Sequence, residues 1–155
     1  MKLADFINIA SVIPDLKATD RNGVIRELIQ SLADNGSLAQ DSVETVARAA
    51  IQRENQGSTG FGKGVAVPHV KHECIEKMSA TIGRSSQGVD FAALDRAPVY
   101  TVVMLLSPGS DPDGHLGAME RIFRHLQRDN FRRFLRQADT REQIQELILE
   151  ADETL

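Results

Sequence analysis

At 155 residues, the chain is long enough to form one domain with a substantial core, so residues 1–155 are expected to be a single domain. Its formal net charge of −4 argues against a general nucleic-acid-binding protein, whose surface would carry a positive excess. The chain has one cysteine, Cys74, which cannot form an internal disulfide, and it shows neither a signal-like apolar start nor an apolar run of membrane-spanning length. These features together indicate a cytoplasmic protein.

The first third of the chain predicts an irregular segment followed by an amphipathic helix. Residues 3–16 carry apolar side chains without a clean period, which indicates a short helix or loop and then an extended piece. Either Thr19 or Asp20 can cap the helix that follows, and the Asp-Asn-Gly sequence at 34–36 is expected to end it. The apolar stripe of this helix consists of Val24, Ile25, Leu28, Ile29 and Leu32.

A second helix is predicted to begin near Asp41 and to end at the Arg53-Glu54 pair. Its buried face would consist of Val43, Val46, Ala47 and Ala50. On a helical projection Arg53 falls at the edge of that face, where the helix enters a glycine-rich segment. Two interpretations stay open for this guanidinium. It could extend to water or pair locally, or it could bind an anion, for which its fork geometry and permanent charge are suited.

The most distinctive stretch is residues 57–69, Gly-Ser-Thr-Gly-Phe-Gly-Lys-Gly-Val-Ala-Val-Pro-His. Its glycines lie at positions 57, 60, 62 and 64. Glycine permits positive φ and a close approach of the backbone, so free N–H groups could face an anion. Residues 65–67 predict a short strand, and Pro68 fixes the backbone directly before His69. Because a neutral imidazole, with an unperturbed pKa of about 6.5, is a good nucleophile near neutral pH, this stretch suggests chemistry on a phosphoryl group.

The middle of the chain predicts most of a sheet. Residues 70–78 are polar and mixed, which favours a loop or a turn of helix. Residues 79–84 and 89–91 predict a hairpin whose turn is 85–88. The run 99–106 is almost entirely apolar and rich in β-branched residues, which is typical of a central strand that is covered on both faces.

The last part of the chain predicts a loop and three helices. Residues 107–114 form the loop at the carboxyl end of the central strand, and the longest helix, about 115–128, follows with Asp113 as its cap. A short helix at 130–138 precedes a last helix that begins with the capping box Thr140–Gln143. The elements together predict an α/β fold in which helices cover both sides of a small mixed β-sheet.

A second histidine, His115, is predicted to lie in the first turn of the longest helix, on the side that faces the core. A helix N-terminus attracts anions and disfavours a cationic imidazole. Loops at the carboxyl ends of strands are also where α/β sheets usually place their functional sites. Position alone leaves one alternative open, a partly buried histidine that is hydrogen-bonded to a backbone carbonyl.

Three parts of the sequence resemble one bacterial protein family. They are the segment Thr59–His69, the Arg53-Glu54 pair upstream of it, and the His115-Leu116 pair at the start of a helix. Together they are similar to the enzyme IIA component of the bacterial phosphotransferase system, fructose/mannitol type, which includes the nitrogen-regulatory IIA proteins. The likeness covers nearly the full chain. It implies the fructose/mannitol-type IIA fold, with His69 as the phosphorylated residue, His115 as its active-site partner and Arg53 as a phosphate-stabilising side chain.

The resemblance implies a phosphoryl carrier that accepts its group from an HPr-like protein and passes it to a IIB-type acceptor, through a phosphohistidine and without a cofactor or metal. The alternative is a regulatory module that binds target proteins according to the phosphorylation state of His69. The transition state of phosphoryl transfer spreads negative charge over its oxygens, so N–H and hydroxyl donors are expected to hold them. Besides Arg53 and the helix start at His115, the expected phosphate-binding residues are Thr59, Gly60, Gly62 and Gly64.

Other features have simpler interpretations. His69, His72 and Cys74 would make poor metal ligands, because residues 69 and 72 of a strand point to opposite faces and no second cluster completes a tetrahedron. Cys74 is expected to be a structural or incidental thiol, and His125, which lies off the apolar stripe of its helix, is expected to be exposed. The basic C-terminal third predicts a solvated face, with docking of an acidic partner as the alternative. Its arginines are Arg121, Arg124, Arg128, Arg132, Arg133, Arg136 and Arg141.

Overall fold

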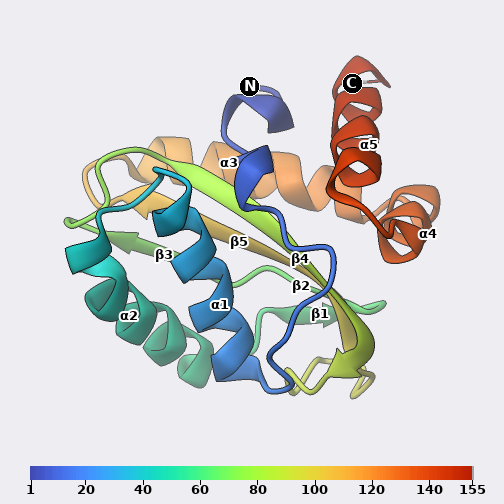
Figure 1. Cartoon of the computed structure of the whole chain (residues 1–155), viewed down its shortest axis with the longest axis horizontal. Helices are drawn as coiled ribbons and strands as arrows, with labels where there is room; N and C mark the ends of the chain where they lie inside the picture. The colour runs from blue at the N-terminus through green and yellow to red at the C-terminus, as the bar shows by residue number, and fades with distance from the viewer. Residues whose placement is uncertain (155) are drawn as a thin grey trace.

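The structure, a computed structural model, describes residues 1–154 and places helices on both faces of a mixed, five-stranded sheet (Figure 1). One face is covered by α1 (Arg21–Asp34) and α2 (Val43–Gln56). The other face is covered by α3 (Pro112–Leu126), α4 (Asp129–Gln137) and α5 (Arg141–Thr154). This arrangement confirms the predicted architecture. All helices within residues 1–154 fall short of the length and apolarity that crossing a bilayer requires.

The sheet is built around β5 (Val99–Pro108), the predicted central strand. On one side of it lies β4 (Ser79–Val89), which pairs antiparallel. On the other side two short strands lie end to end, β2 (Val65–Ala66) and β3 (His69–His72), and both run parallel to β5. The outermost strand, β1 (Gly60–Gly62), pairs antiparallel with β2.

Side chains of β5 alternate between two apolar cores, as the two-residue period of a strand requires. Met104 and Leu106 belong to the core under α1 and α2, whereas Val103 and Leu105 belong to the core under α3, α4 and α5. Both sets are almost completely buried. The nearly unbroken apolar run at 99–106 therefore follows from the coverage of both faces of the sheet.

The N-terminal residues 3–16 lie beside β4 as an irregular edge. They form two 3₁₀ turns, η1 (Leu3–Asp5) and η2 (Ile9–Ser11), and then an extended stretch, which agrees with the sequence prediction. Single bridges join this segment to the sheet at Ile7–Ala80 and Ile13–Gly83. The open edge of β4 is thus partly covered, which protects it from pairing with another chain.

The two ends of the chain are joined by one carboxylate. Asp152 of α5 accepts hydrogen bonds from the backbone N–H groups of Leu3, at 2.7 Å, and Ala4, at 3.0 Å. These N–H groups lie in η1 and lack partners within their own turn, so the carboxylate satisfies donors that would otherwise need water. The N-terminal turn is therefore attached to the last helix (Figure 1).

Two of the predicted sheet elements are wrong. Residues 85–88 do not form a hairpin turn, because β4 is a single strand in which the register with β5 shifts between Arg84 and Val89. The extra residues form a bulge, and Gly88 (φ +86°) lies within it. Residues 70–72 are not part of a loop but belong to β3, whose hydrogen bonds come from β5. Such a short parallel strand carries no period of its own that a sequence could reveal.

The helix ends are set by caps, most of them predictable. Asp20 caps α1 by accepting a hydrogen bond from the N–H of Gly23 at 2.7 Å. α3 begins three residues earlier than predicted, at Pro112, because its cap is Asp111 rather than Asp113. The Asp111 carboxylate accepts from the N–H of Gly114 at 3.0 Å. Proline in the first turn favours this earlier start, since its fixed φ suits a helix and its missing N–H is not needed there.

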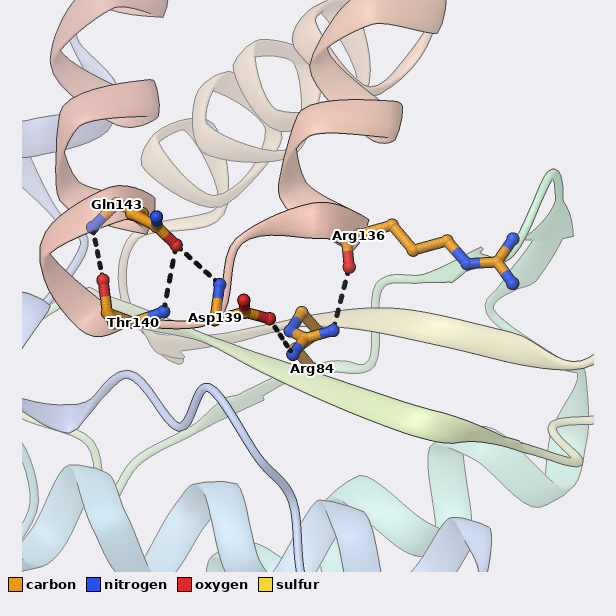
Figure 2. Close-up of polar contacts among 5 residues, drawn as sticks. All are labelled: Arg84, Arg136, Asp139, Thr140 and Gln143. Atoms are coloured by element: carbon orange, nitrogen blue, oxygen red, sulfur yellow. Dashed lines mark hydrogen bonds and ion pairs between the residues drawn. The ribbon is translucent and has the colours of Figure 1, made fainter.

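The junction between α4 and α5 is attached to the sheet by Arg84 of β4 (Figure 2). One guanidinium nitrogen donates to the backbone carbonyl of Arg136 at 2.9 Å, and another pairs with Asp139 at 3.2 Å. The predicted capping box follows directly, with Gln143 N–H donating to Thr140 Oγ1 at 3.1 Å and Thr140 N–H donating to Gln143 Oε1 at 3.3 Å (Figure 2). The last two helices thus have a defined position over the sheet.

His125 of α3 is buried, with 1% of its surface exposed, so the prediction that it is exposed is wrong. α4 folds back over α3 and packs Phe131 against the imidazole, with 5.6 Å between ring centroids. Neither ring nitrogen has a hydrogen-bond partner within residues 1–154. Burial, together with the charges of nearby arginines, lowers the pKa of His125 below its usual value, although Asp152 opposes this shift.

We expect His125→Leu to stabilise the fold by about 1 kcal/mol at neutral pH, since it removes a buried polar ring without partners. The gain should grow as the pH falls below 6.5, because the unfolded state then binds a proton that the folded state resists. Urea denaturation at neutral and at lower pH measures both effects. His72→Leu, a change in a partly exposed histidine, is the control. A loss of stability for His125→Leu at every pH would contradict the prediction.

Candidate active site

His69 is the first residue of β3 and lies at the break between two strands. β2 ends at Ala66, Pro68 interrupts the strand, and β3 then resumes the pairing with β5 at Leu105. The Pro68 carbonyl accepts a hydrogen bond from the N–H of Leu105 at 3.0 Å, which anchors the backbone on the N-terminal side of His69. The imidazole remains partly exposed while its backbone belongs to the central sheet. A rigid backbone therefore holds a side chain that another molecule can reach.

One hydrogen bond determines the tautomer of His69. Its Nδ1 lies 2.8 Å from the backbone carbonyl of Val67. A carbonyl oxygen can only accept, so Nδ1 carries the proton and donates it. In the neutral ring, Nε2 then holds the free lone pair. His69 thus presents a nucleophilic nitrogen whose identity follows from the backbone between β2 and β3.

His115 lies beside His69, with 5.3 Å between ring centroids and 47° between ring planes. It comes from the first turn of α3 and has 5% of its surface exposed. Its Nδ1 lies 2.7 Å from the hydroxyl of Ser107, a buried residue near the end of β5. The structure thus brings the two histidines together, as the sequence analysis expected. The alternative, a bond from His115 to a backbone carbonyl, is replaced by a bond to a serine side chain.

The environment favours the neutral form of both histidines. Burial lowers the pKa of His69 below 6.5, and the positive charges of Arg53 and Lys71 lower it further, against the opposing bond to the Val67 carbonyl. Burial, His69 and Lys71 lower the pKa of His115 to about 4. At neutral pH both rings are therefore uncharged, and the positive charge near the site comes from Arg53 and Lys71.

Arg53 lies in the last turn of α2, and its Nη1 donates to the backbone carbonyl of Gly57 at 2.8 Å. This contact satisfies a carbonyl just beyond the end of the helix. It corresponds to local pairing, which was one of the two interpretations that the sequence left open for Arg53. The side chain is also close enough to His69 for its charge to lower the pKa of the imidazole. A single bond to one carbonyl leaves the other guanidinium donors available.

Glu54 is a site residue that sequence reasoning missed. Its carboxylate has 2% of its surface exposed and accepts two hydrogen bonds from Thr59, from the N–H at 2.7 Å and from the hydroxyl at 2.8 Å. The two donors of Thr59 that were expected to face a phosphate therefore face a carboxylate instead. The available signal was the spacing of Glu54, which follows Ala50 by four residues on the apolar face of α2.

The expected anion cradle of Gly60, Gly62 and Gly64 is wrong. These residues form the β1–β2 hairpin, whose turn needs positive φ at Gly62 (+110°) and Gly64 (+78°). β2 pairs with β5 at Thr101, whereas His69 pairs with Leu105, so the turn points toward the opposite end of β5. Four residues of strand correspond to roughly 13 Å. The N–H of Gly60 is also engaged, because it donates to Ser58 Oγ at 3.0 Å.

The side chains considered as metal ligands have other contacts. His72 Nδ1 accepts a hydrogen bond from the backbone N–H of Cys74 at 3.0 Å. Within the described part of the chain, residues 1–154, no cluster of three or more His, Cys, Asp or Glu side chains is arranged to hold a metal ion. This bond joins His72, the last residue of β3, to the turn that follows the strand.

Comparison with known proteins shows that the chain matches one protein family. The model described as "Phosphoenolpyruvate-dependent sugar phosphotransferase system, EIIA 2" matches residues 5–151. A nitrogen regulatory protein of Bradyrhizobium diazoefficiens is 32% identical over 136 residues, which covers 88% of this chain and 87% of that protein. The fructose-specific EIIABC component of Bacillus subtilis is 29% identical over 152 residues. That match covers 98% of this chain and only 24% of the longer relative, so the chain corresponds to one part of it.

Solved structures share the fold. The nitrogen regulatory protein IIA-Ntr of Neisseria meningitidis superposes with a TM-score of 0.84 at 23% identity, over 94% of this chain and 98% of that one. An Escherichia coli enzyme IIA for mannitol, solved in complex with its phosphorylated enzyme IIB, gives a TM-score of 0.77 at 17% identity, over 92% and 96% of the two chains.

Proposed function

This chain belongs to the EIIA 2 family of the phosphoenolpyruvate-dependent sugar phosphotransferase system, and from that premise we propose that it carries a phosphoryl group on Nε2 of His69 between two other proteins. The observation that carries the proposal is the fixed tautomer of His69, whose Nδ1 proton is held by the Val67 carbonyl at 2.8 Å. A lone pair at a partly exposed nitrogen is what nucleophilic attack on a phosphoryl group requires.

The proposed transfer needs no net movement of a proton. The N–P bond of a donor phosphohistidine breaks, and its electron pair remains on the donor nitrogen. Nε2 of His69 supplies the pair for the new N–P bond, while the proton stays on Nδ1 and remains hydrogen-bonded to the Val67 carbonyl. This carbonyl stabilises the positive character that the ring gains as the new bond forms, since it accepts a hydrogen bond from that ring. The accepted group can then leave by the same path in reverse.

Arg53 and His115 are the proposed partners of the transferred group. Arg53 can exchange its bond to the Gly57 carbonyl for a phosphoryl oxygen, since a guanidinium offers five donors. His115 remains neutral, so it would act through a hydrogen bond rather than a charge. Positive charge and N–H donors can supply the stabilisation that phosphoryl transfer requires, and the proposal therefore includes no metal or cofactor.

The proposed partners are an HPr-like protein as donor and a IIB-type protein as acceptor. Support for the acceptor comes from the similar mannitol IIA, whose structure contains its phosphorylated IIB. Leu116, which follows His115 in sequence, has 66% of its surface exposed. An exposed leucine next to His115 suits a site at which another protein must dock to bring its reacting residue to His69.

A regulatory role is the second candidate, because several similar proteins are named nitrogen regulatory proteins. In that case the charge added at His69 would change which target protein binds. The test of both is an intact-mass measurement after incubation with phosphoenolpyruvate, enzyme I and HPr. One acid-labile phosphoryl group supports the carrier chemistry. Its transfer to an added IIB protein favours the carrier role, whereas its retention together with altered binding of another protein favours regulation. An unmodified mass would refute the proposal.

We expect the rate of phosphorylation to fall to half its value at neutral pH only below pH 6.5. Burial lowers the pKa of His69 below 6.5, so most of the rings still have a free lone pair at Nε2 at that pH, and protonation at lower pH removes it. Initial rates with phosphoramidate, a small donor that needs no docking, measure this profile. A rate that is already halved above pH 6.5 would contradict the lowered pKa.

A further inference from the structure

We propose that Ser107 is a positioning residue that holds His115 as the Nε2–H tautomer, so that this ring donates a hydrogen bond to the transferred phosphoryl group. The hydrogen bond to a phosphoryl group rests on the proposed function, whereas the tautomer of His115 does not. The inference starts from the bond of 2.7 Å between Ser107 Oγ and His115 Nδ1. Ser107 has no exposed surface, so water does not compete for its hydroxyl.

The direction of this bond follows from where the serine proton can go. A hydroxyl has one proton, and within residues 1–154 the structure gives the Ser107 hydroxyl no hydrogen-bond partner other than His115. If His115 donated from Nδ1, the serine proton would be buried without an acceptor, which costs about 1–3 kcal/mol. If Ser107 donates, both groups are satisfied. His115 then accepts at Nδ1 and carries its proton on Nε2.

The two histidines are thereby set in opposite tautomers. The Val67 carbonyl can only accept, so His69 is protonated at Nδ1 and has its lone pair at Nε2. The Ser107 hydroxyl donates, so His115 has its proton at Nε2. With the two ring centroids 5.3 Å apart, one ring offers a nucleophile and its neighbour offers a donor for an oxygen of the same phosphoryl group.

A hydroxyl suits this position better than a carboxylate would. A carboxylate beside Nδ1 accepts from it, favours the imidazolium and selects the other tautomer. Ser107 adds no charge, and burial keeps His115 neutral. An uncharged ring still needs one partner to choose between its two tautomers, and Ser107 is the partner that the fold provides. β5 and α3, which are joined by a short loop, hold the pair in place.

The first experiment reads the tautomers directly, without any phosphoryl donor. In protein labelled with ¹⁵N in its histidine rings, long-range ¹H–¹⁵N spectra at neutral pH should show His69 protonated at Nδ1 and His115 at Nε2. In Ser107→Ala, His115 should become a mixture of both tautomers while His69 is unchanged. Ser107→Thr, which keeps a hydroxyl, should retain the Nε2–H form, and Ser107→Val, its match in shape without the hydroxyl, should lose it. An Nδ1–H form of His115 in the wild type would overturn the proposal, as would an unchanged tautomer in Ser107→Ala and Ser107→Val.

The second experiment measures phosphorylation of the same four proteins. We expect Ser107→Ala and Ser107→Val to be about tenfold slower, the equivalent of 1.36 kcal/mol in the barrier, and Ser107→Thr to stay near the wild type. If Ser107→Thr and Ser107→Val differ in the tautomer of His115 but are phosphorylated at equal rates, the proposed role of this tautomer in phosphoryl transfer is refuted. If the wild type accepts no phosphoryl group yet shows the expected tautomers, the proposed function fails while the hydrogen-bond assignment stands, so the two failures are distinguishable.

Discussion

Replacement of His69 by alanine is expected to abolish phosphorylation completely, because Nε2 of this ring is the only nucleophile that the proposed transfer uses. The intact mass of His69→Ala should remain unchanged under conditions in which the wild type gains one phosphoryl group. The effect on stability should be small, since the side chain is partly exposed and its hydrogen bond is to a carbonyl two residues away. Far-UV circular dichroism and a thermal melt check that the variant is folded.

His72→Ala is the matched control for this result. It changes a second histidine of the same strand, also partly exposed, whose ring accepts a hydrogen bond from the Cys74 N–H. This variant should be phosphorylated at the wild-type rate. A phosphoryl group on His69→Ala, or its loss from His72→Ala, would place the nucleophile elsewhere.

Arg53→Ala is expected to slow phosphorylation by about 10²–10³, the usual cost of removing one donor that stabilises transition-state charge. The final extent of modification should be unchanged when enough time is allowed, because His69 keeps its nucleophile. Removal of this positive charge should also raise the pKa of His69, since the charge now lowers it. The midpoint of the rate–pH profile of Arg53→Ala should therefore lie at a higher pH than that of the wild type, in addition to the loss of rate.

Arg53→Lys separates the charge of this side chain from its geometry. A lysine keeps the positive charge but lacks the planar fork, so we expect a rate between those of the wild type and the alanine variant. The bond from Arg53 to Gly57 at the helix end could also matter for stability, and thermal melts of both variants measure this separately. A wild-type rate in Arg53→Ala would mean that the guanidinium only caps the end of α2 and takes no part in phosphoryl transfer.

The elements that were predictable from the sequence are those whose signals are local. α1 shows a regular apolar stripe and begins at its Asp20 cap, and the box Thr140–Gln143 begins α5 as expected. β5 was recognisable because its burial on both faces requires an unbroken apolar run. His69 and His115 were also found, one by its proline-fixed position and the other by its place after the central strand.

The predictions that failed depended on contacts between distant parts of the chain. The glycines of 60–64 permit either an anion cradle or a tight hairpin, and only the pairing of β2 with β5 decides between them. His125 lies off the apolar stripe of α3, yet α4 buries it. Ser107 was unremarkable in the sequence, where it was assigned to a loop, because its importance arises from a histidine eight residues away and from the burial of both. Burial and pairing of this kind are properties of the assembled fold.

The carboxylate of Asp152 also has a consequence for the order of events during synthesis. The amides of Leu3 and Ala4 are made well before their acceptor, since Asp152 follows Leu3 by 149 residues. Until α5 has emerged, water and not Asp152 accepts hydrogen bonds from these two amides. The turn η1 is then not yet attached to the last helix. The sheet and His69 can form earlier, since β3, β4 and β5 lie wholly upstream of this helix. Attachment of the N-terminal turn is thus a late event, whereas the strands that carry His69 and its neighbours are complete before α5 is made.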